Sequence, residues 1–142
     1  MQILKVKTKE RAIGDIGERL ALKYLKKHGY KIREKNYVVF DSEIDIIAEN
    51  KTTLAFVEVK TRTLDPDREY FGRPASAVTP EKQRKIIKVA KYYAAGHPCE
   101  KRLSLDIIEV YLTKDKKEDK ILHLENAFNI NTSRTPIRKA SV

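Results

Sequence analysis

The residues SEIDIIA (42–48) and LAFVEVK (54–60) are the most informative part of this sequence. Both runs are rich in Ile and Val, short enough to be β-strands, and joined by a polar segment of hairpin length. Charge inside an otherwise apolar strand pair is costly unless it is paired or bound to an ion. The two runs therefore predict a β-hairpin with a site on it, built from the charged residues Glu43, Asp45, Glu58 and Lys60.

The turn of this hairpin determines which charges face one another. Side chains alternate along a strand, so the two acids of the first run share a face, as do the glutamate and lysine of the second. A loop at residues 49–52 would place Glu43 opposite Glu58, and a loop at residues 50–53 would place Asp45 there. Both registers gather the four charges on one side of the sheet, whereas a three-residue loop would separate them.

Opposed carboxylates suggest a metal ion. Directly opposed residues have Cβ atoms about 4.5 to 5.5 Å apart, which lets two carboxylates bracket one ion. Like charges at that distance repel one another unless a cation lies between them. Asp45 and Glu58, with Lys60 two residues later, therefore predict a divalent metal site with an ammonium group beside it.

Three blocks of the sequence resemble a known family. Asp45 followed by Glu58-Val59-Lys60 resembles the PD-(D/E)XK nuclease signature, a pattern that is weak by itself. More specific are the order and spacing of GDIGERLA (14–21), EIDII (43–47) and FVEVKTR (56–62). These blocks resemble the YraN-like bacterial family of uncharacterised proteins, which is similar to archaeal Holliday junction resolvases. The resemblance runs from about residue 10 to about residue 128.

The resemblance implies an α/β fold with a restriction-endonuclease-like αβββαβ core, in which helices flank a central mixed β-sheet. It also implies roles for the hairpin residues. Asp45 and Glu58 would bind Mg²⁺ or Mn²⁺ together with the backbone carbonyl of Val59. Lys60 would hold or deprotonate the attacking water.

Two further acids are candidates for the same site. Glu18 projects from a predicted helix toward its apolar side. It is either a carboxylate at the edge of the buried face, paired with a lysine, or, as the resemblance implies, an extra metal or water ligand. Glu43 shares the face of Asp45 and could bind a second ion or hold Lys60.

The helix that carries Glu18 is predicted from about Arg11 to His28, because apolar residues recur there at helical spacing. Gly14 and Gly17 lie beside the apolar stripe. Glycine lowers helix propensity, so we expect these residues to allow close approach to a sheet.

Residues 61–78 read as a long loop with two prolines, a glycine and no periodicity. Arg62 and Arg73, together with Tyr70 and Phe71, suit a flap that contacts a phosphate backbone or an unstacked base. A surface excursion without such a role is the alternative.

A second helix is predicted to start at Thr79-Pro80-Glu81, which supplies an N-cap hydroxyl, a first-turn proline and an acid near the positive helix end. The helix carries a row of lysines, which most simply form a solvated face. Lys82 and Lys85 lie in its first turns, near the expected open end of the hairpin, and are candidates for phosphate contacts.

The other elements are read more coarsely. Residues 30–32 and 37–40 form one interrupted strand or two short ones, residues 103–112 form a central strand, and residues 121–124 form an edge strand. Asp106, inside the central strand, is interpreted as a structural acid bonded to the backbone or to a helix, with metal binding as the alternative. The three histidines are predicted to be surface residues: His28, His97 and His123.

Composition bounds the class of protein. A chain of 142 residues predicts one domain over 1–142, with flexible tails at 1–9 and 130–142. A single cysteine, no signal peptide and no apolar span of membrane length indicate a cytoplasmic protein. The net charge of +10 favours a polyanionic partner, DNA more than RNA, although a lysine-rich surface kept for solubility would also produce it.

These observations predict a metal-dependent nuclease that hydrolyses phosphodiester bonds in DNA, including branched or junction DNA. Similar resolvases are symmetric dimers, so a homodimer is consistent with this interpretation. Two alternatives stay open at this point. One is a nucleic-acid-binding module with the nuclease fold but no turnover, and the other is an assembly factor whose basic helix binds an acidic partner.

Overall fold

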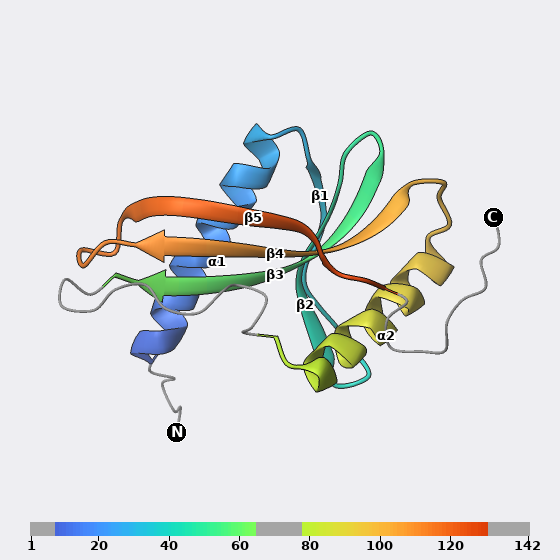
Figure 1. Cartoon of the computed structure of the whole chain (residues 1–142), viewed down its shortest axis with the longest axis horizontal. Coiled ribbons are helices and arrows are strands. Elements are labelled where there is room, and N and C mark those ends of the chain that lie inside the picture. The colour runs from blue at the N-terminus through green and yellow to red at the C-terminus, as the bar shows by residue number, and fades with distance from the viewer. Residues whose placement is uncertain (1–7, 65–77, 131–142) are drawn as a thin grey trace, which may run out of the picture.

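The two runs of the hairpin form strands β2 (Ser42–Glu49) and β3 (Thr53–Thr63) in a computed structural model that describes residues 8–64 and 78–130. Around them lie α1 (Lys9–Lys27), β1 (Lys31–Val39), α2 (Pro80–Gly96), β4 (Arg102–Leu112) and β5 (Glu118–Phe128). Figure 1 shows α1 running across the strands, and α2 packed beside β2.

The strands form one five-stranded sheet in the order β1-β2-β3-β4-β5. Neighbouring strands are antiparallel except for β3 and β4, which are parallel. A parallel pair needs a crossover connection, and the segment that contains α2 provides it. The prediction of an α/β, restriction-endonuclease-like αβββαβ core is confirmed, with β5 added at the sheet edge.

Each face of the sheet has its own hydrophobic core. On one face Ala21 and Leu25 of α1 pack with alternate strand residues such as Val57. On the other face Ile87 and Tyr93 of α2 pack with the intervening strand residues, whose side chains point to that face. The middle strands are therefore covered on both sides, which explains their nearly continuous apolar runs.

Close contact between α1 and β3 explains one of the two glycines. A Cβ atom at Gly17 would lie 1.9 Å from Thr61 Oγ1 and 2.9 Å from Thr61 Cβ, so only glycine fits there. At Gly14 an added Cβ would meet nothing within 4 Å. The predicted close approach is thus confirmed for Gly17 and wrong for Gly14.

The hairpin register is the one predicted for a loop at residues 50–53. Strand β2 pairs with β3 from Glu49–Leu54 to Ile46–Val57. Asn50 stabilises the turn, because its Oδ1 accepts hydrogen bonds from the backbone N–H groups of Thr52 and Thr53, at 3.0 and 2.8 Å.

Several boundaries differ from the predictions because of long-range pairing. Residues 61–63, predicted as the start of a loop, continue β3 because they pair with residues 110–112 of β4. The edge strand is longer than residues 121–124, since β5 pairs along most of β4. Strand β1 is one strand with a register shift between Ile32 and Glu34, which is the interrupted-strand alternative.

Two other predictions concern the chain ends and the membrane. Helix α1 begins at Lys9, with the Thr8 side chain as its N-cap, so the predicted flexible tail at 1–9 is wrong for these two residues, and its residues 1–7 lie outside the described residues. Residues 131–142 of the other predicted tail lie outside the described residues. Neither described helix combines the length and the apolar character that crossing a bilayer requires.

Candidate active site

Strands β2 and β3 separate where the charged residues begin. Their pairing ends at Ile46–Val57, whereas β2 continues to pair with β1 as far as Ser42. Beyond the last β2–β3 pair, the backbone N–H of Val59 donates a hydrogen bond of 2.8 Å to Asp45 Oδ2. A side chain thus replaces the next ladder bond. This bond holds the Asp45 carboxylate in the opening between the strands, beside Glu58.

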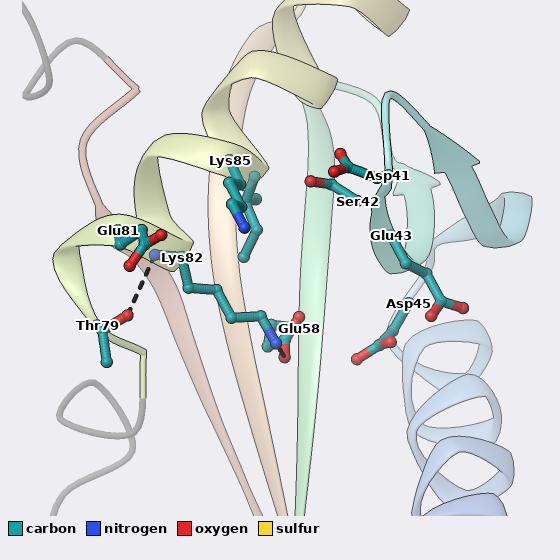
Figure 2. A pocket seen from close by; sticks show the side chains of 10 residues that line it. Asp41, Ser42, Glu43, Asp45, Glu58, Thr79, Glu81, Lys82 and Lys85 are labelled. Atoms are coloured by element: carbon teal, nitrogen blue, oxygen red, sulfur yellow. Dashed lines mark hydrogen bonds and ion pairs between the residues drawn. The ribbon is translucent and has the colours of Figure 1, made fainter.

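Asp45 and Glu58 line two cavities, of about 400 and 420 Å³. The first lies between the N-terminal turns of α2 and the start of β2, and Figure 2 shows its lining side chains. The second lies between α1 and the end of β3, and is lined by Glu18, Val59 and Lys60 among others. The two acids are therefore reachable from both sides of the strand opening.

Glu58 is held between two ammonium groups. Its side chain is only 8% exposed, and its Oε2 accepts a hydrogen bond of 3.0 Å from Lys82 Nζ. Lys60 Nζ lies 3.6 Å from the same oxygen. Figure 2 shows the Lys82 side chain extending from α2 to Glu58 across the first cavity. Two cations thus balance one nearly buried carboxylate.

Asp45 has a different electrostatic environment. It is half-buried, and burial is the largest cause that raises its pKa, followed by the nearby charge of Glu58. The hydrogen bond from the Val59 N–H opposes the shift, and the net result is a pKa of about 7. Burial and the neighbouring carboxylate thus both disfavour the charged form of Asp45, and a bound cation would favour it.

Glu18 and Glu43 add to this negative field. Glu18 accepts weak hydrogen bonds of 3.4 and 3.5 Å from Asn36 Nδ2, so its partner is an amide on β1 rather than the lysine considered above. Burial raises the pKa of Glu18, the Asn36 bond lowers it, and the charge of Glu43 raises it further. Glu43 itself is exposed and lines the first cavity.

The carboxylate oxygens of this site are compatible with binding of a hard divalent cation. Among residues 8–64 and 78–130, no three His, Cys, Asp or Glu side chains come close enough to form a metal cage by themselves. Mg²⁺ does not need one, because it commonly takes one or two carboxylates and completes its octahedron with water and substrate phosphate. Asp45 and Glu58 fit that requirement.

The predicted nucleic-acid contacts have three different placements. Lys82 and Lys85 both line the first cavity. The Nε of Arg62 is bonded to the fully buried Glu109, which also accepts a hydrogen bond from Tyr111. Arg73 lies outside the described residues, as do Tyr70 and Phe71. The predicted position of Lys82 near the open end of the hairpin is confirmed, but its bond to Glu58, which forms only when α2 packs on the sheet, could not be predicted from the sequence.

A second polar network lies under α1, on β4 and β5. Asp106 accepts hydrogen bonds from Ser104 Oγ and from the backbone N–H of Asn126, and it contacts His123 Nε2 at 2.8 Å. The structural interpretation of Asp106 is thus confirmed. The surface prediction for His123 is wrong, because its side chain is only 5% exposed in the sheet beside Asp106 and Tyr24. His28 and His97 are exposed, as predicted.

Comparison of the sequence with known proteins identifies one protein family that it matches. The model for "Uncharacterised protein family UPF0102" matches residues 17–110. A UPF0102 protein of Caldanaerobacter subterraneus subsp. tengcongensis is 44% identical over 124 residues, covering 86% of this chain and 98% of the relative. A UPF0102 protein of Clostridium acetobutylicum is 42% identical over 118 residues, covering 82% and 93%. One of Flavobacterium psychrophilum is 40% identical over 117 residues, covering 82% and 92%. These names state no activity.

Proposed function

This chain belongs to the UPF0102 (YraN-like) family, which has a nuclease fold, and we propose that it is a metal-dependent nuclease that hydrolyses phosphodiester bonds in DNA. One observation carries the proposal. At the point where β2 and β3 separate, two carboxylates line both cavities, and two lysine ammonium groups lie beside Glu58, that of Lys82 in the first cavity and that of Lys60 in the second.

Each of these groups has a role in phosphodiester hydrolysis. Asp45 and Glu58, with the carbonyl of Val59, would hold Mg²⁺ or Mn²⁺, which polarises a phosphate and lowers the pKa of a bound water. Lys60 lies beside Glu58, where its ammonium group can hold a water by a hydrogen bond and offset the negative charge that develops on it. Lys82 enters the first cavity from α2 and can offset charge that develops on the phosphate.

Three other residues have supporting roles in this proposal. Glu18, on the α1 side of the opening, would orient a water in the second cavity. Glu43, which lines the first cavity, would hold a second ion. Lys85 would contact a neighbouring phosphate.

DNA is the preferred substrate class in this proposal, with branched DNA included. The net charge of +10 favours a polyanion, and the similarity of the family to junction resolvases favours DNA with branches. Branched, blunt-duplex and single-stranded substrates should therefore be compared directly.

The decisive experiment measures cleavage of these substrates by the full chain in Mg²⁺, in Mn²⁺ and in EDTA. We expect cleavage that requires metal and falls by about a hundredfold or more in Glu58→Gln and Lys60→Ala. Glu49→Gln is the matched control, because Glu49 is also an ion-paired acid of this hairpin but lies at its closed end, bonded to Lys101. Cleavage that persists in EDTA, or in Glu58→Gln, would contradict the proposal.

One observation favours a second candidate function. Because Lys60 and Lys82 already neutralise Glu58, these charges also make sense as a structural ion-pair cluster in a nucleic-acid-binding module without turnover. Binding that weakens steeply with salt, with no cleavage of any substrate in either metal, would support that module.

A further inference from the structure

We propose that the turn between β1 and β2, together with the adjacent face of α2, forms a stacking site for an unpaired nucleotide of the DNA. The site consists of Phe40, Tyr92 and Lys88. This inference rests on the proposed function only in naming DNA as the ligand, and its test does not depend on cleavage.

The backbone at Phe40 is the first observation. Val39 pairs with Ser42, so the turn between them contains only Phe40 and Asp41. Both have positive φ angles, 67° and 112°. Two-residue hairpin turns of this kind normally use Asn, Asp or Gly, and a bulky aromatic residue with positive φ is an outlier. Such outliers concentrate at functional sites, so we infer that the aromatic ring at this turn has a function.

The surroundings of the ring are the second observation. Phe40 and Tyr92 remain 49% and 52% exposed, although both are large and aromatic. Their rings form an edge-to-face pair with centroids 5.1 Å apart. Lys88 Nζ lies 4.7 Å from the centre of the Phe40 ring. Exposed aromatic rings with an ammonium beside them match the combination that binds unstacked bases and the adjacent phosphate.

Continuity with the candidate active site is the third observation. Asp41 and Ser42 follow Phe40 directly and line the first cavity together with Asp45 and Glu58. On α2, residues 85, 88 and 92 have the i, i+3, i+7 spacing of one helix face, and Lys85 lines that cavity as well. A DNA strand with one phosphate at the two acids and its next nucleotides along the first cavity would therefore bring a base to Phe40.

The chemistry favours DNA over a second copy of this chain as the occupant. A stable protein interface buries about 800 Å² on each partner, far more than two half-exposed rings supply. Lys88 also lies against the Phe40 ring, and lysine is depleted at the centre of protein interfaces and common at phosphate contacts.

The test compares binding of a blunt DNA duplex with binding of the same duplex carrying a short single-stranded end. Fluorescence anisotropy with dye-labelled DNA in EDTA and low salt measures both affinities without cleavage. Phe40→Asn is the main variant, because asparagine tolerates positive φ and keeps the turn while it removes the ring. Phe40→Trp retains stacking, and Leu122→Ala alters an exposed apolar residue on β5 as a control.

We expect the natural sequence to prefer the duplex with the single-stranded end. Phe40→Asn and Tyr92→Ala should weaken binding of that DNA by about fivefold or more and leave blunt-duplex binding unchanged. Phe40→Trp and Leu122→Ala should behave like the natural sequence. An unchanged affinity in Phe40→Asn and Tyr92→Ala, or no preference in the natural sequence, would overturn the stacking site even if the nuclease proposal stands.

Light scattering on the same samples tests the other occupant. If Phe40→Asn reduces the size of a self-associated species and leaves DNA affinity unchanged, the patch is a contact between copies and the stacking proposal is wrong. If the chain cleaves no substrate but shows the predicted effect of Phe40→Asn, the nuclease proposal fails and the stacking site stands.

Discussion

Glu58 shows how much of the proposed chemistry depends on single side chains. It is nearly buried, and two lysines from different elements balance its charge. Leaving a buried carboxylate without partners is costly, so the lysines stabilise the site in the absence of metal. The same lysines repel a cation that approaches Glu58. The structure therefore predicts a competition between Lys82 and a divalent ion for one oxygen atom.

Replacement of Lys82 should expose that competition. We expect Lys82→Gln to tighten Mg²⁺ binding by about fivefold, equivalent to about 1 kcal/mol, because an ammonium 3.0 Å from Glu58 is removed. Isothermal titration calorimetry measures this affinity without substrate. Lys85→Gln, one turn later on α2 and lining the same cavity, is the control and should have a smaller effect. Weaker Mg²⁺ binding in Lys82→Gln would contradict the competition.

Asp45 should make stability depend on pH. Burial and the charge of Glu58 raise its pKa from 3.8 to about 7, so the folded protein retains a proton that the unfolded chain releases. Stability should therefore fall as pH rises from about 4 to about 7, with the full penalty present above that window. We expect Asp45→Asn, measured by calorimetry in EDTA, to be more stable at about pH 8 by on the order of 1 kcal/mol, a gain that disappears near pH 4.

A second acid of the same hairpin, Glu49, should make stability depend on pH in the opposite direction. The hydrogen bond from Lys101 is the largest cause that lowers the pKa of Glu49, so its carboxylate stabilises the fold above its unfolded pKa. Glu49→Gln should therefore lower stability at neutral pH. Stabilisation by Glu49→Gln, or destabilisation by Asp45→Asn at about pH 8, would show that the assigned electrostatics are wrong.

At the scale of elements, the contact between α1 and β3 places Glu18 over the strand opening. The contact depends on Gly17, whose missing side chain leaves room for Thr61. Threonine is β-branched and stiff, and its Cβ would also lie only 2.9 Å from an added methyl, so rotation of its side chain cannot make room. Helix and strand would have to move apart.

The two glycines of α1 should therefore respond in opposite directions to alanine. We expect Gly17→Ala to lower the free energy of unfolding by about 1 to 3 kcal/mol through overpacking, despite the better helix propensity of alanine. Gly14→Ala, which meets nothing within 4 Å, should raise it by about 0.5 to 1 kcal/mol. Urea denaturation measures both. Equal responses would mean that α1 does not approach β3 as closely as described.

At the scale of the whole molecule, the positive charge predicts DNA affinity that falls with salt. Each lysine that contacts a phosphate contributes about one unit to the slope of log affinity against log salt concentration. We expect Lys85→Gln, at the first cavity, to reduce the slope by about one. Lys116→Gln is the control, because it lies in the turn between β4 and β5, at the end of the sheet away from α2, and should leave the slope unchanged (Figure 1). Equal slopes for both variants would mean that binding does not use the first cavity.

Much of the fold follows from local sequence. The caps at Thr8 and Thr79, the apolar runs of the strands and the spacing of the charged residues on the hairpin all depend on residues within a few positions of one another. Helical and strand periodicities are local as well, so the elements and their buried faces could be predicted. The family blocks then identified the nuclease fold that joins these elements.

Only the tertiary structure decided which of these residues meet. The bonds from Lys82 to Glu58, from His123 to Asp106 and from Arg62 to Glu109 join residues 24, 17 and 47 positions apart. The choice between the two hairpin registers, the length of β5 and the ring pair at the β1–β2 turn depend equally on packing between elements. Sequence period determines the direction of a side chain from its own element, but the position of a second element determines what that side chain meets.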